Sequence, residues 1–450
     1  MTSLSREQLD ASQSAGGVTL VIAGAGTGKT KTLIRKITTI IERGISSENI
    51  LVLTFSRKAA EEIRARVRDE IGDPAFGLVA GTFHSFCLSF LKEHSETFRT
   101  RFGYLRFPAV MEEDERKSMI REVIRKRIGD FLGIPLDVVE RFVSDPLKCK
   151  GHIKARMDQY GLSEKIRDVR EAFQREKLSR SVFDFQDLMD HTLDMLEHDE
   201  EIRLNVRDRF RYVLVDEFQD TSPDNFRLLE LITNKNSPNL FVVGDDWQSI
   251  YGFRYSSIEY IVKIKRFFPE AEIHRLTVNY RSRHEIVTLS NRFIRNNRYR
   301  TSKRLRSYKG RGGIVRKHIV QDGEQENEAI AAILTELNNN AGSIAILYRN
   351  NWQGRIIARF LGTRVSGFLA DNLQMMTIHA SKGLEFDTVI VAGISDSILP
   401  DPSSDIEEER RLMYVALTRA REELHLICHT TGIGKLSKFA GELNARRFAD

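Results

Sequence analysis

The most regular feature of the chain is a series of short apolar runs, each followed by a polar turn. The first run covers residues 18–23, VTLVIA, and leads into the glycine-rich stretch 24–30, GAGTGKT. This order predicts a buried strand followed by a loop and an amphipathic helix. The helix is indicated by apolar residues at helical spacing, namely Leu33, Ile34, Ile37, Ile40 and Ile41.

Similar apolar runs recur further along the chain and also end in polar residues. Residues 50–56, ILVLTFS, predict a second buried strand, and a further apolar piece ends in 81–86, GTFHSF. Residues 212–215 and 240–243 repeat the pattern. Ligands of open parallel sheets bind at the carboxyl ends of the strands. We therefore expect the polar residues that follow these runs to surround a ligand.

Residues 90–204 have a different texture, because their apolar residues recur at helical spacing and no convincing strand appears. We expect an all-helical insertion here. Its basic residues form a solvated helix face or, alternatively, touch a polyanion. They crowd the outer face and are Arg116, Lys117, Arg121, Arg125, Lys126 and Arg127.

Composition narrows the class of protein. A chain of 450 residues with 41% apolar and 29% charged residues predicts a soluble globular protein of two to four domains. The net charge of +6 is small for this length, so it decides little about partners. Cys87, Cys149 and Cys428 are widely spaced, which argues against a zinc site or a disulfide scaffold and suits a reducing cytoplasm. We expect neither a signal peptide nor a membrane span.

The glycine-rich loop has the composition of a phosphate cradle. Its glycines let backbone N–H groups point at phosphates, Lys29 supplies a compact cation, and Thr30 can ligate Mg²⁺. Ala23 occupies the place where the strict pattern has glycine. The alternative is a glycine-rich turn with an incidental lysine.

A short helix that begins at Ser5 is predicted just before the first strand, and it carries Gln8. A glutamine amide both donates and accepts, so Gln8 could read the edge of an adenine. Taken alone, its residue type favours a surface position.

Two adjacent carboxylates follow the run at 212–215. Asp216 can hold the same Mg²⁺ as Thr30, and Glu217 can orient and deprotonate an attacking water. Acidic pairs also cap or solvate, but the phosphate loop in the same chain favours the metal role.

The next run, 240–243, continues as GDDWQSIYGFR over residues 244–254. Gln248 is placed to sense a γ-phosphate, while Phe253 and Arg254 could stack on and grip a single strand of nucleic acid. The alternative is that the aromatic residues belong to the core.

Taken in order, these motifs and those of the second half resemble superfamily 1 DNA helicases of the UvrD/Rep type, most closely the helicase IV branch. The resemblance spans residues 4 to about 429, and Ala23 is normal for the family. The motifs are 23–30 AGAGTGKT, 54–60 TFSRKAA, 82–85 TFHS, 216–221 DEFQDT, 244–251 GDDWQSIY, 278–282 VNYRS, 346–349 ILYR, 377–386 TIHASKGLEF and 409–420 ERRLMYVALTRA.

The resemblance implies an α/β fold with two RecA-like P-loop domains and ATP between them. Domain 1 would cover residues 1–89 and 205–275, the helical insertion 90–204, and domain 2 residues 276–450. In the second domain, apolar runs predict strands at 314–320, 343–348, 374–378, 388–392 and 424–428.

The resemblance also implies roles for individual residues. Gln8 and Tyr280 would bind adenine, and Arg281 and Arg419 would act as arginine fingers beside Lys29, Glu217 and Gln248. The remaining nucleotide contacts would be Ala23, Gly24, Ala25, Gly26, Thr27, Gly28, Thr30 and Glu385. DNA contacts would be Phe55, Thr82, His84, Phe253 and Arg254, with Arg349 and His379 as further candidates.

One charge run goes beyond the family motifs. Residues 286–321 contain no acidic residue and eleven basic ones. The run either tracks phosphates or forms a solvated surface. Its members are Arg292, Arg295, Arg298, Arg300, Lys303, Arg304, Arg306, Lys309, Arg311, Arg316 and Lys317.

The resemblance implies an ATP- and Mg²⁺-dependent DNA helicase that translocates 3′ to 5′ on single-stranded DNA, acts at junctions with duplex and serves DNA repair or replication. The alternatives are a DNA-stimulated ATPase that strips proteins from DNA with little unwinding, or a non-catalytic scaffold, against which Lys29, Glu217 and Arg419 argue. UvrD/Rep relatives carry a large accessory domain between the motifs that end at Arg349 and begin at Thr377. Only 27 residues, 350–376, fill that interval here, too few for a separate domain.

Overall fold

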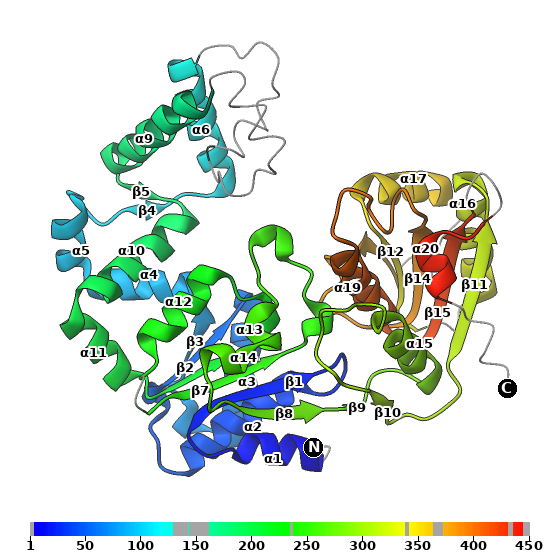
Figure 1. Ribbon diagram of the computed structural model, residues 1–450, viewed down its shortest axis with the longest axis horizontal. Helices are drawn as coiled ribbons and strands as arrows, with labels where there is room; N and C mark the ends of the chain where they lie inside the picture. The colour runs from blue at the N-terminus through cyan, green and yellow to red at the C-terminus, as the bar shows by residue number, and fades with distance from the viewer. Residues whose placement is uncertain are drawn as a thin grey trace. The chain divides into compact units, whose positions relative to one another are not determined.

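The computed structural model describes residues 4–128, 143, 162–234, 237–337, 342–362, 372–430 and 435–443. The chain forms two compact units, whose elements are labelled in Figure 1. The two-sheet unit comprises Met1–Ala80, Phe210–Phe226 and Thr233–Asp450, and the helical unit comprises Gly81–Arg209 and Arg227–Ile232.

The first sheet has six strands in the order β3-β2-β6-β7-β1-β8. β1 pairs in parallel with β7 and β8, and β6 pairs in parallel with β2 and β7. The carboxyl ends of these strands therefore meet at one edge of the sheet. The strands are β1 (Gly17–Ala23), β2 (Ile50–Thr54), β3 (Val79–Thr82), β6 (Tyr212–Val215), β7 (Asn239–Gly244) and β8 (Glu272–Leu276).

Helices cover this sheet because alternate apolar residues of its strands need partners on each face. On one face, Val21 and Val52 pack with Ile37 of α2 and Ile63 of α3 in one buried cluster. The helix before β1 begins at Ser5, as predicted, with Ser5 as its cap. The helices of this part are α1 (Arg6–Gln13), α2 (Lys29–Glu42), α3 (Arg57–Ile71), α13 (Glu259–Val262) and α14 (Ile264–Phe267), and α12 (Pro223–Ile232) is divided between the two units after Phe226.

The second sheet is parallel throughout and has the strand order β11-β15-β14-β12-β13. All five strands predicted from the sequence are present, with ends that differ by a few residues. They are β11 (Ile314–Val320), β12 (Ile344–Tyr348), β13 (Leu373–Thr377), β14 (Phe386–Ile394) and β15 (Ala420–His429).

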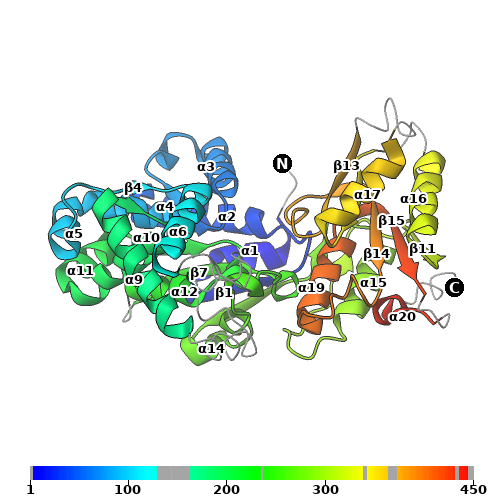
Figure 2. The ribbon, with the colours of Figure 1, turned by 90° about the horizontal axis from the view of Figure 1, so that it is seen from above.

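Alternate residues of β12 show how the second sheet is covered. Ala345 and Leu347 pack with α15, α19 and α20, while Ile344 and Ile346 pack with α16 and α17. Figure 2 shows α16 and α17 on one side of this sheet and α15 and α20 on the other. These elements are α15 (His284–Ile294), α16 (Gly323–Leu337), α17 (Asn351–Leu361), α19 (Ile406–Leu417) and α20 (Lys438–Glu442), with the short strand pair β9 (Val278–Asn279) and β10 (Arg306–Ser307).

The described residues of the helical unit form helices, as expected, but they also include one short strand pair that the sequence pattern did not predict. β4 (Ala109–Val110) pairs in parallel with β5 (Val182–Phe183). Two-residue strands leave no visible alternation in the sequence, which explains the omission. The helices of this unit are α4 (Phe83–Glu93), α5 (Ser95–Phe102), α6 (Glu113–Ile128), α9 (Leu162–Arg180), α10 (Phe185–His198) and α11 (Glu200–Arg209).

The helical unit buries an ionic cluster beside an aromatic one. The ammonium of Lys177 lies 3.0 Å from Asp184 and 2.6 Å from Asp187. The ring of His191 packs 4.2 Å from the ring of Phe102. Burial lowers the pKa of His191 to about 4. The imidazole is therefore neutral in the folded unit at neutral pH.

Two further expectations from the sequence concerned membrane spans and cysteine chemistry. Among the described residues, no helix is long and apolar enough to span a bilayer. Cys87 and Cys428 are buried free thiols, and Cys149 lies outside the described residues.

Candidate functional site

The glycine-rich loop connects β1 to α2 and ends in an uncapped helix N-terminus. α2 begins at Lys29, and Gly28 precedes it with a φ of 83° and no side-chain cap. Gly26 also has a positive φ, of 67°, and a Cβ there would lie 2.6 Å from Cβ of Arg281. Only glycine fits these two positions without strain. Unsatisfied N–H groups at a helix N-terminus favour an anion, so the loop has the form that a phosphate group needs.

Gln8 is buried against this loop. The prediction of a surface position, which its residue type favours, is therefore wrong. Its exposure is 3%, and its Nε2 donates to the carbonyl of Thr27 at 2.9 Å. Its Oε1 accepts from the backbone N–H of Ser5 at 2.9 Å, as part of the capping box of α1. A contact between Gln8 and adenine stays a prediction.

The segment that carries Tyr280 is joined to the same loop. The backbone N–H of Tyr280 donates to the carbonyl of Gly26 at 2.8 Å, and Asn279 Nδ2 donates to the carbonyl of Ala25 at 2.7 Å. The ring of Tyr280 lies 5.0 Å from that of Tyr308. The half-buried Tyr280 is therefore held next to the phosphate loop.

The two carboxylates predicted after the apolar run at 212–215 follow β6. Asp216 is buried, and its backbone N–H donates to the carbonyl of Leu53 at 3.0 Å. Glu217 has a φ of 54°, which is unusual for a residue with a side chain. Strained backbone of this kind persists where the surroundings fix it, often at functional sites. Gln219 Nε2 donates to Glu217 Oε2 at 2.5 Å and supplies part of that support.

The surroundings of Asp216 and Glu217 shift the pKa values of the two carboxyl groups in opposite directions. Burial and the neighbouring Glu217 raise the pKa of Asp216 to about 7. Burial would also raise the pKa of Glu217, but the positive charges of Lys29 and Lys382 outweigh it and lower that pKa to about 2. Glu217 is therefore ionised at neutral pH.

The hydroxyl of Thr30 and the carboxylate of Asp216 suit Mg²⁺ better than a metal whose ligands all come from protein side chains. Among the described residues, no group of three or more His, Cys, Asp or Glu side chains could hold a metal ion. Mg²⁺ often takes only one or two carboxylates and completes its shell with phosphate and water. Nearby, Oδ1 of Asp220 and Oγ1 of Thr221 are buried without a protein hydrogen-bond partner. The hydroxyl of Thr30 and the carboxylate of Asp216 fit such a partial shell.

Arg419, from the turn after α19, contacts the motif that follows β7. Its Nη2 donates to Oε1 of Gln248 at 3.0 Å. Its Nη1 and Nε donate to the carbonyls of Leu384 and Val415, each at 3.0 Å. Burial lowers the pKa of Arg419 to about 9, so the guanidinium keeps its charge at neutral pH. The structure thus joins two of the predicted catalytic residues directly.

Arg281 and Glu385, both predicted nucleotide contacts, form an ion pair. Arg281 Nε lies 2.5 Å from Glu385 Oε2, and Arg281 Nη1 donates to the carbonyl of Thr418 at 3.0 Å. Arg421 Nη2 lies 2.5 Å from the other oxygen of Glu385. Burial would raise the pKa of Glu385, but Arg281 and Arg421 hold it below its usual value.

The sequence interpretation assigned no role to Lys382, although its motif was recognised. Its ammonium lies 2.5 Å from Oδ2 of Asp220 and donates to the carbonyl of Gln248 at 3.1 Å. It also lies 4.6 Å from the ring centre of Tyr251. A lysine within the 377–386 motif was the available signal, but its partners are distant in sequence.

An aromatic cluster surrounds Phe253. The ring of Phe253 meets those of Tyr251 and His379 at 5.9 and 5.6 Å. Phe253 is 56% exposed, so the alternative of a core position is wrong. The side chain of Arg254 lies outside the described residues. An exposed ring beside other rings is suited to stack on a base.

The other predicted DNA contacts have different surroundings. Phe55 is 37% exposed at the end of β2. Thr82 and His84 belong to the helical unit, where the Thr82 hydroxyl accepts from the backbone N–H of Ser85 at 3.1 Å and caps α4. His84 is exposed, and its ring lies 5.4 Å from that of Phe185.

Arg349, the remaining candidate DNA contact, has a protein partner. Its Nη2 lies 3.0 Å from Oε1 of the buried Glu409. A DNA contact by this guanidinium would compete with that pair, and it stays a prediction.

The basic run 286–321 is not uniform. The side chain of Lys303 is fully buried and paired with Asp245 and Asp246, which excludes it from tracking phosphates. Lys309 and Arg316 are paired with glutamates, at 2.7 and 2.5 Å. Five other members are exposed, namely Arg295, Arg298, Arg304, Arg306 and Arg311.

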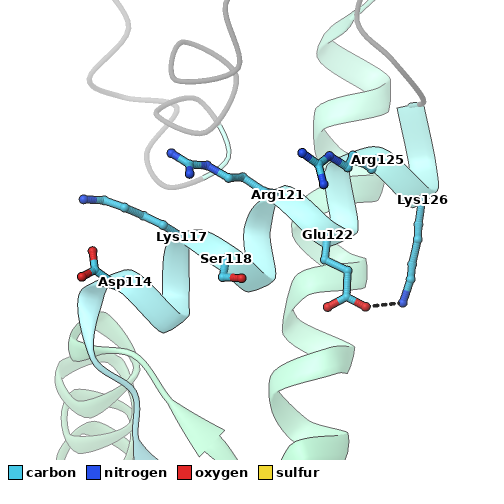
Figure 3. Close-up of a pocket in the computed structure, with 7 residues that line it drawn as sticks. All are labelled: Asp114, Lys117, Ser118, Arg121, Glu122, Arg125 and Lys126. Carbon is cyan, nitrogen blue, oxygen red and sulfur yellow. Dashed lines mark hydrogen bonds and ion pairs between the residues drawn. The ribbon is translucent and has the colours of Figure 1, made fainter.

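The basic face of the helical insertion borders an open hollow of about 820 Å³ (Figure 3). Within the part of the chain that the structure describes, the hollow is lined by one helix, α6. Its charges are mixed, because Lys126 Nζ donates to Glu122 Oε1 at 2.7 Å. Contact with a polyanion stays a prediction here. The lining residues are Asp114, Lys117, Ser118, Arg121, Glu122, Arg125 and Lys126.

Comparison with known proteins covers nearly the whole chain. The model of the UvrD/REP helicase N-terminal domain matches residues 4–269, and that of the UvrD-like helicase C-terminal domain matches 274–365 and 362–431. The chain is 31% identical over 366 residues to the ATP-dependent DNA helicase PcrA of Staphylococcus aureus, and 31% identical over 363 residues to that of Staphylococcus epidermidis. Each match covers 79% of this chain and 49% of the relative, so the chain spans about half the length of these curated relatives.

Proposed function

Because the chain belongs to the UvrD/Rep family of helicases, we propose that it is an ATP-dependent DNA helicase that translocates 3′ to 5′ on single-stranded DNA. The two sheets would be the cores of the two RecA-like domains, with bounds at residues 1–89 and 205–275 for the first and 276–450 for the second. Residues 90–204 would be the helical insertion of the first domain.

The nucleotide would bind along the loop that follows β1. Lys29, with the N–H groups of residues 23–28, would hold its phosphates, since an uncapped helix N-terminus favours anions. Gln8 and Tyr280 would contact the adenine from the two segments that pack on the loop. Mg²⁺, held by Thr30 and Asp216, would neutralise phosphate charge when bound.

Hydrolysis would depend on the ionised side chain of Glu217. Its carboxylate would accept a proton from the attacking water, and Gln219 would keep that carboxylate in position. Arg281 and Arg419 would stabilise the negative charge that develops on the transferred phosphoryl group, as arginine fingers do. Gln248 would sense the γ-phosphate, and Glu385 would contact the nucleotide from the second domain.

The single observation that carries this proposal is the hydrogen bond from Arg419 to Gln248. It joins the turn after α19 of the second domain to the motif after β7 of the first. An arginine finger acts only when its domain is closed against the nucleotide, so hydrolysis would depend on the arrangement of both domains. That dependence is what couples ATP turnover to movement.

DNA would be gripped by exposed aromatic side chains and by groups at the ends of the strands. Phe253 and His379 would stack on bases, and Phe55, Thr82 and His84 would also contact the strand. Arg254 and Arg349 would pair with phosphates. Single-stranded DNA and its junctions with duplex are therefore the proposed partners.

A second candidate function is a DNA-stimulated ATPase that strips proteins from DNA and unwinds little. The interval of 27 residues between Arg349 and Thr377 favours it, because relatives carry a large accessory domain there that regulates unwinding. In either case the two motor domains would drive stepping.

The direct test is ATP hydrolysis with and without single-stranded DNA. We expect strong stimulation by single strands and little by blunt duplex. A rate of hydrolysis that is the same with and without DNA, or no hydrolysis at all, would contradict the proposal. Strand displacement on duplexes with either a 3′ or a 5′ tail then separates the helicase from the stripping ATPase.

A further inference from the structure

Lys303 lies between α15 and β10, in the basic run, yet its side chain has no exposed surface. Its Nζ lies 2.6 Å from Oδ1 of Asp245 and 2.7 Å from Oδ1 of Asp246, and 4.6 Å from the ring centre of Trp247. All three charged side chains have no exposed surface. A buried ammonium is stable only with such partners, so this position is specifically built around a cation.

The two carboxylates have different tasks. Asp246 accepts from the backbone N–H and the hydroxyl of Thr301, at 2.7 and 2.5 Å, and so anchors the segment that carries Lys303. Asp245 instead binds residues of its own motif. Its Oδ1 accepts from the N–H of Trp247 at 3.1 Å, and its Oδ2 accepts from Nε2 of Gln248 at 2.5 Å.

The bond from Gln248 to Asp245 fixes which way the glutamine amide points. An ionised carboxylate only accepts hydrogen bonds, so it must face the NH₂ group of Gln248. The carbonyl oxygen of Gln248 then faces Arg419 and accepts its Nη2 at 3.0 Å. A flipped amide would set donors against donors at Arg419 and acceptors against acceptors at Asp245.

Asp245 also reaches the proposed base through its backbone. Its N–H donates to Oε1 of Gln219 at 2.8 Å, and Nε2 of Gln219 donates to Glu217 at 2.5 Å. Asp245 is therefore the branch point of two short hydrogen-bond chains, and within the described residues Lys303 is the only cation in an ion pair with its carboxylate.

We infer that Lys303 is a positioning residue for ATP hydrolysis, which holds Asp245 so that the amide of Gln248 stays oriented toward Arg419. This inference rests on the proposed function, and it assigns to Lys303 a task inside the protein in place of contact with DNA. Loss of the ammonium leaves Asp245 without its counter-charge, and a glutamine displaced by about 1 Å costs on the order of 100-fold in rate.

Lys303→Met tests this because methionine fills a similar volume without charge. We expect kcat for DNA-stimulated ATP hydrolysis to fall by roughly 10- to 100-fold, while the KM for ATP changes by less than about threefold. The matched control is Thr301→Val, which disturbs the Asp246 side of the same buried network. It should keep kcat within about threefold of the parent.

Comparison of Lys303→Met in the parent and in a Gln248→Ala background distinguishes a positioning role of Lys303 from a purely structural one. In a Gln248→Ala background the lysine has no amide to orient, so Lys303→Met should cost less than about threefold there. A structural lysine would lower kcat by the same factor in both backgrounds, and that result overturns the inference. So does an unchanged kcat for Lys303→Met, or a Thr301→Val variant with an equal loss.

Two controls keep the outcome decisive. Lys303→Gln serves if the methionine variant does not fold, and failure of both neutral variants to fold identifies a structural residue and overturns the inference. The parent chain is assayed in parallel. Hydrolysis by the parent with an unimpaired Lys303→Met variant refutes only the role of Lys303, whereas a parent that does not hydrolyse ATP refutes the proposed function and this inference with it.

Discussion

Nη2 of Arg419 donates to Oε1 of Gln248 at 3.0 Å, although 171 positions separate the two residues in the sequence. Arg419 is fully buried, its Nε and Nη1 donate to backbone carbonyls, and its Nη2 also donates to the hydroxyl of Thr418, so its guanidinium has one defined orientation. The contact brings a proposed arginine finger to the proposed sensor of the γ-phosphate. The predictions below test the chemistry and the DNA contacts that depend on it.

Glu217→Gln should retain binding of ATP and DNA while hydrolysis falls by orders of magnitude. The substitution removes the proton acceptor but leaves Asp216, the proposed metal ligand, and an amide at 217 can still bond to Gln219. Single-turnover hydrolysis and binding of a fluorescent nucleotide measure the two effects separately. Glu61→Gln, at an exposed position of α3, is the control, and near-normal turnover by Glu217→Gln would rule out its role as the base.

Phe253→Ala should weaken binding of single-stranded DNA and reduce stimulation of the ATPase. Each base stacked on an aromatic ring contributes roughly 1–3 kcal/mol, so affinity should fall by about 5- to 150-fold. Fluorescence anisotropy with a labelled oligonucleotide measures this. Phe76→Ala removes another exposed ring, outside the aromatic cluster, and should leave binding unchanged. Equal affinities for the two variants would exclude Phe253 from the DNA site.

Replacing Arg304, Arg306 and Arg311 together by alanine should flatten the salt dependence of DNA binding. Each lost phosphate contact lowers the slope of log K against log salt concentration by about 0.7 for single strands. Lys303 is left in place, because it is buried. Titrations between low and moderate salt give the slope.

The control for this variant removes three exposed arginines from the first-sheet part of the same unit, Arg6, Arg43 and Arg275. It changes net charge by the same amount. If both triple variants keep the parental slope, the exposed residues of the run form an ordinary solvated surface.

The free energy of unfolding of the helical unit should decrease in mild acid because His191 is buried in its neutral form. Burial lowers its pKa in the folded state to about 4, whereas an unfolded histidine titrates near 6.5, so the unfolded state binds more protons between these values. The stabilisation is complete above pH 6.5 and is lost as the pH falls toward 4, at up to about 1.4 kcal/mol per pH unit.

Urea unfolding of the parent and of His191→Gln, followed from pH 7 to pH 4.5, isolates this contribution. The stability difference between the two proteins should shrink or reverse as the pH falls. A difference that stays constant over this range would show that His191 does not titrate differently in the folded unit.

Much of the fold could be predicted from the sequence because both faces of the second sheet are covered by helices. Its central strands β12 and β14 are therefore near-continuous apolar runs, and the pattern located β12 to within a residue. The pair β4–β5 was missed because two-residue strands carry no pattern.

The site was predictable where its chemistry is local. The phosphate loop and the pair Asp216 and Glu217 each occupy one short motif. The burial of Gln8 was not predictable, because it depends on a hydrogen bond to Thr27, 19 positions away. Lys303 was counted with the exposed arginines because charge spacing does not reveal Asp245, 58 positions away in the sequence.

The central claim is directional movement driven by ATP, and fluorescence-monitored translocation on single-stranded oligonucleotides of increasing length tests it most directly. With a dye at the 5′ end, the arrival signal should come later as the strand lengthens. With the dye at the 3′ end, the signal should decay without such a delay. ATP turnover with no length-dependent arrival at the 5′ end would contradict the account.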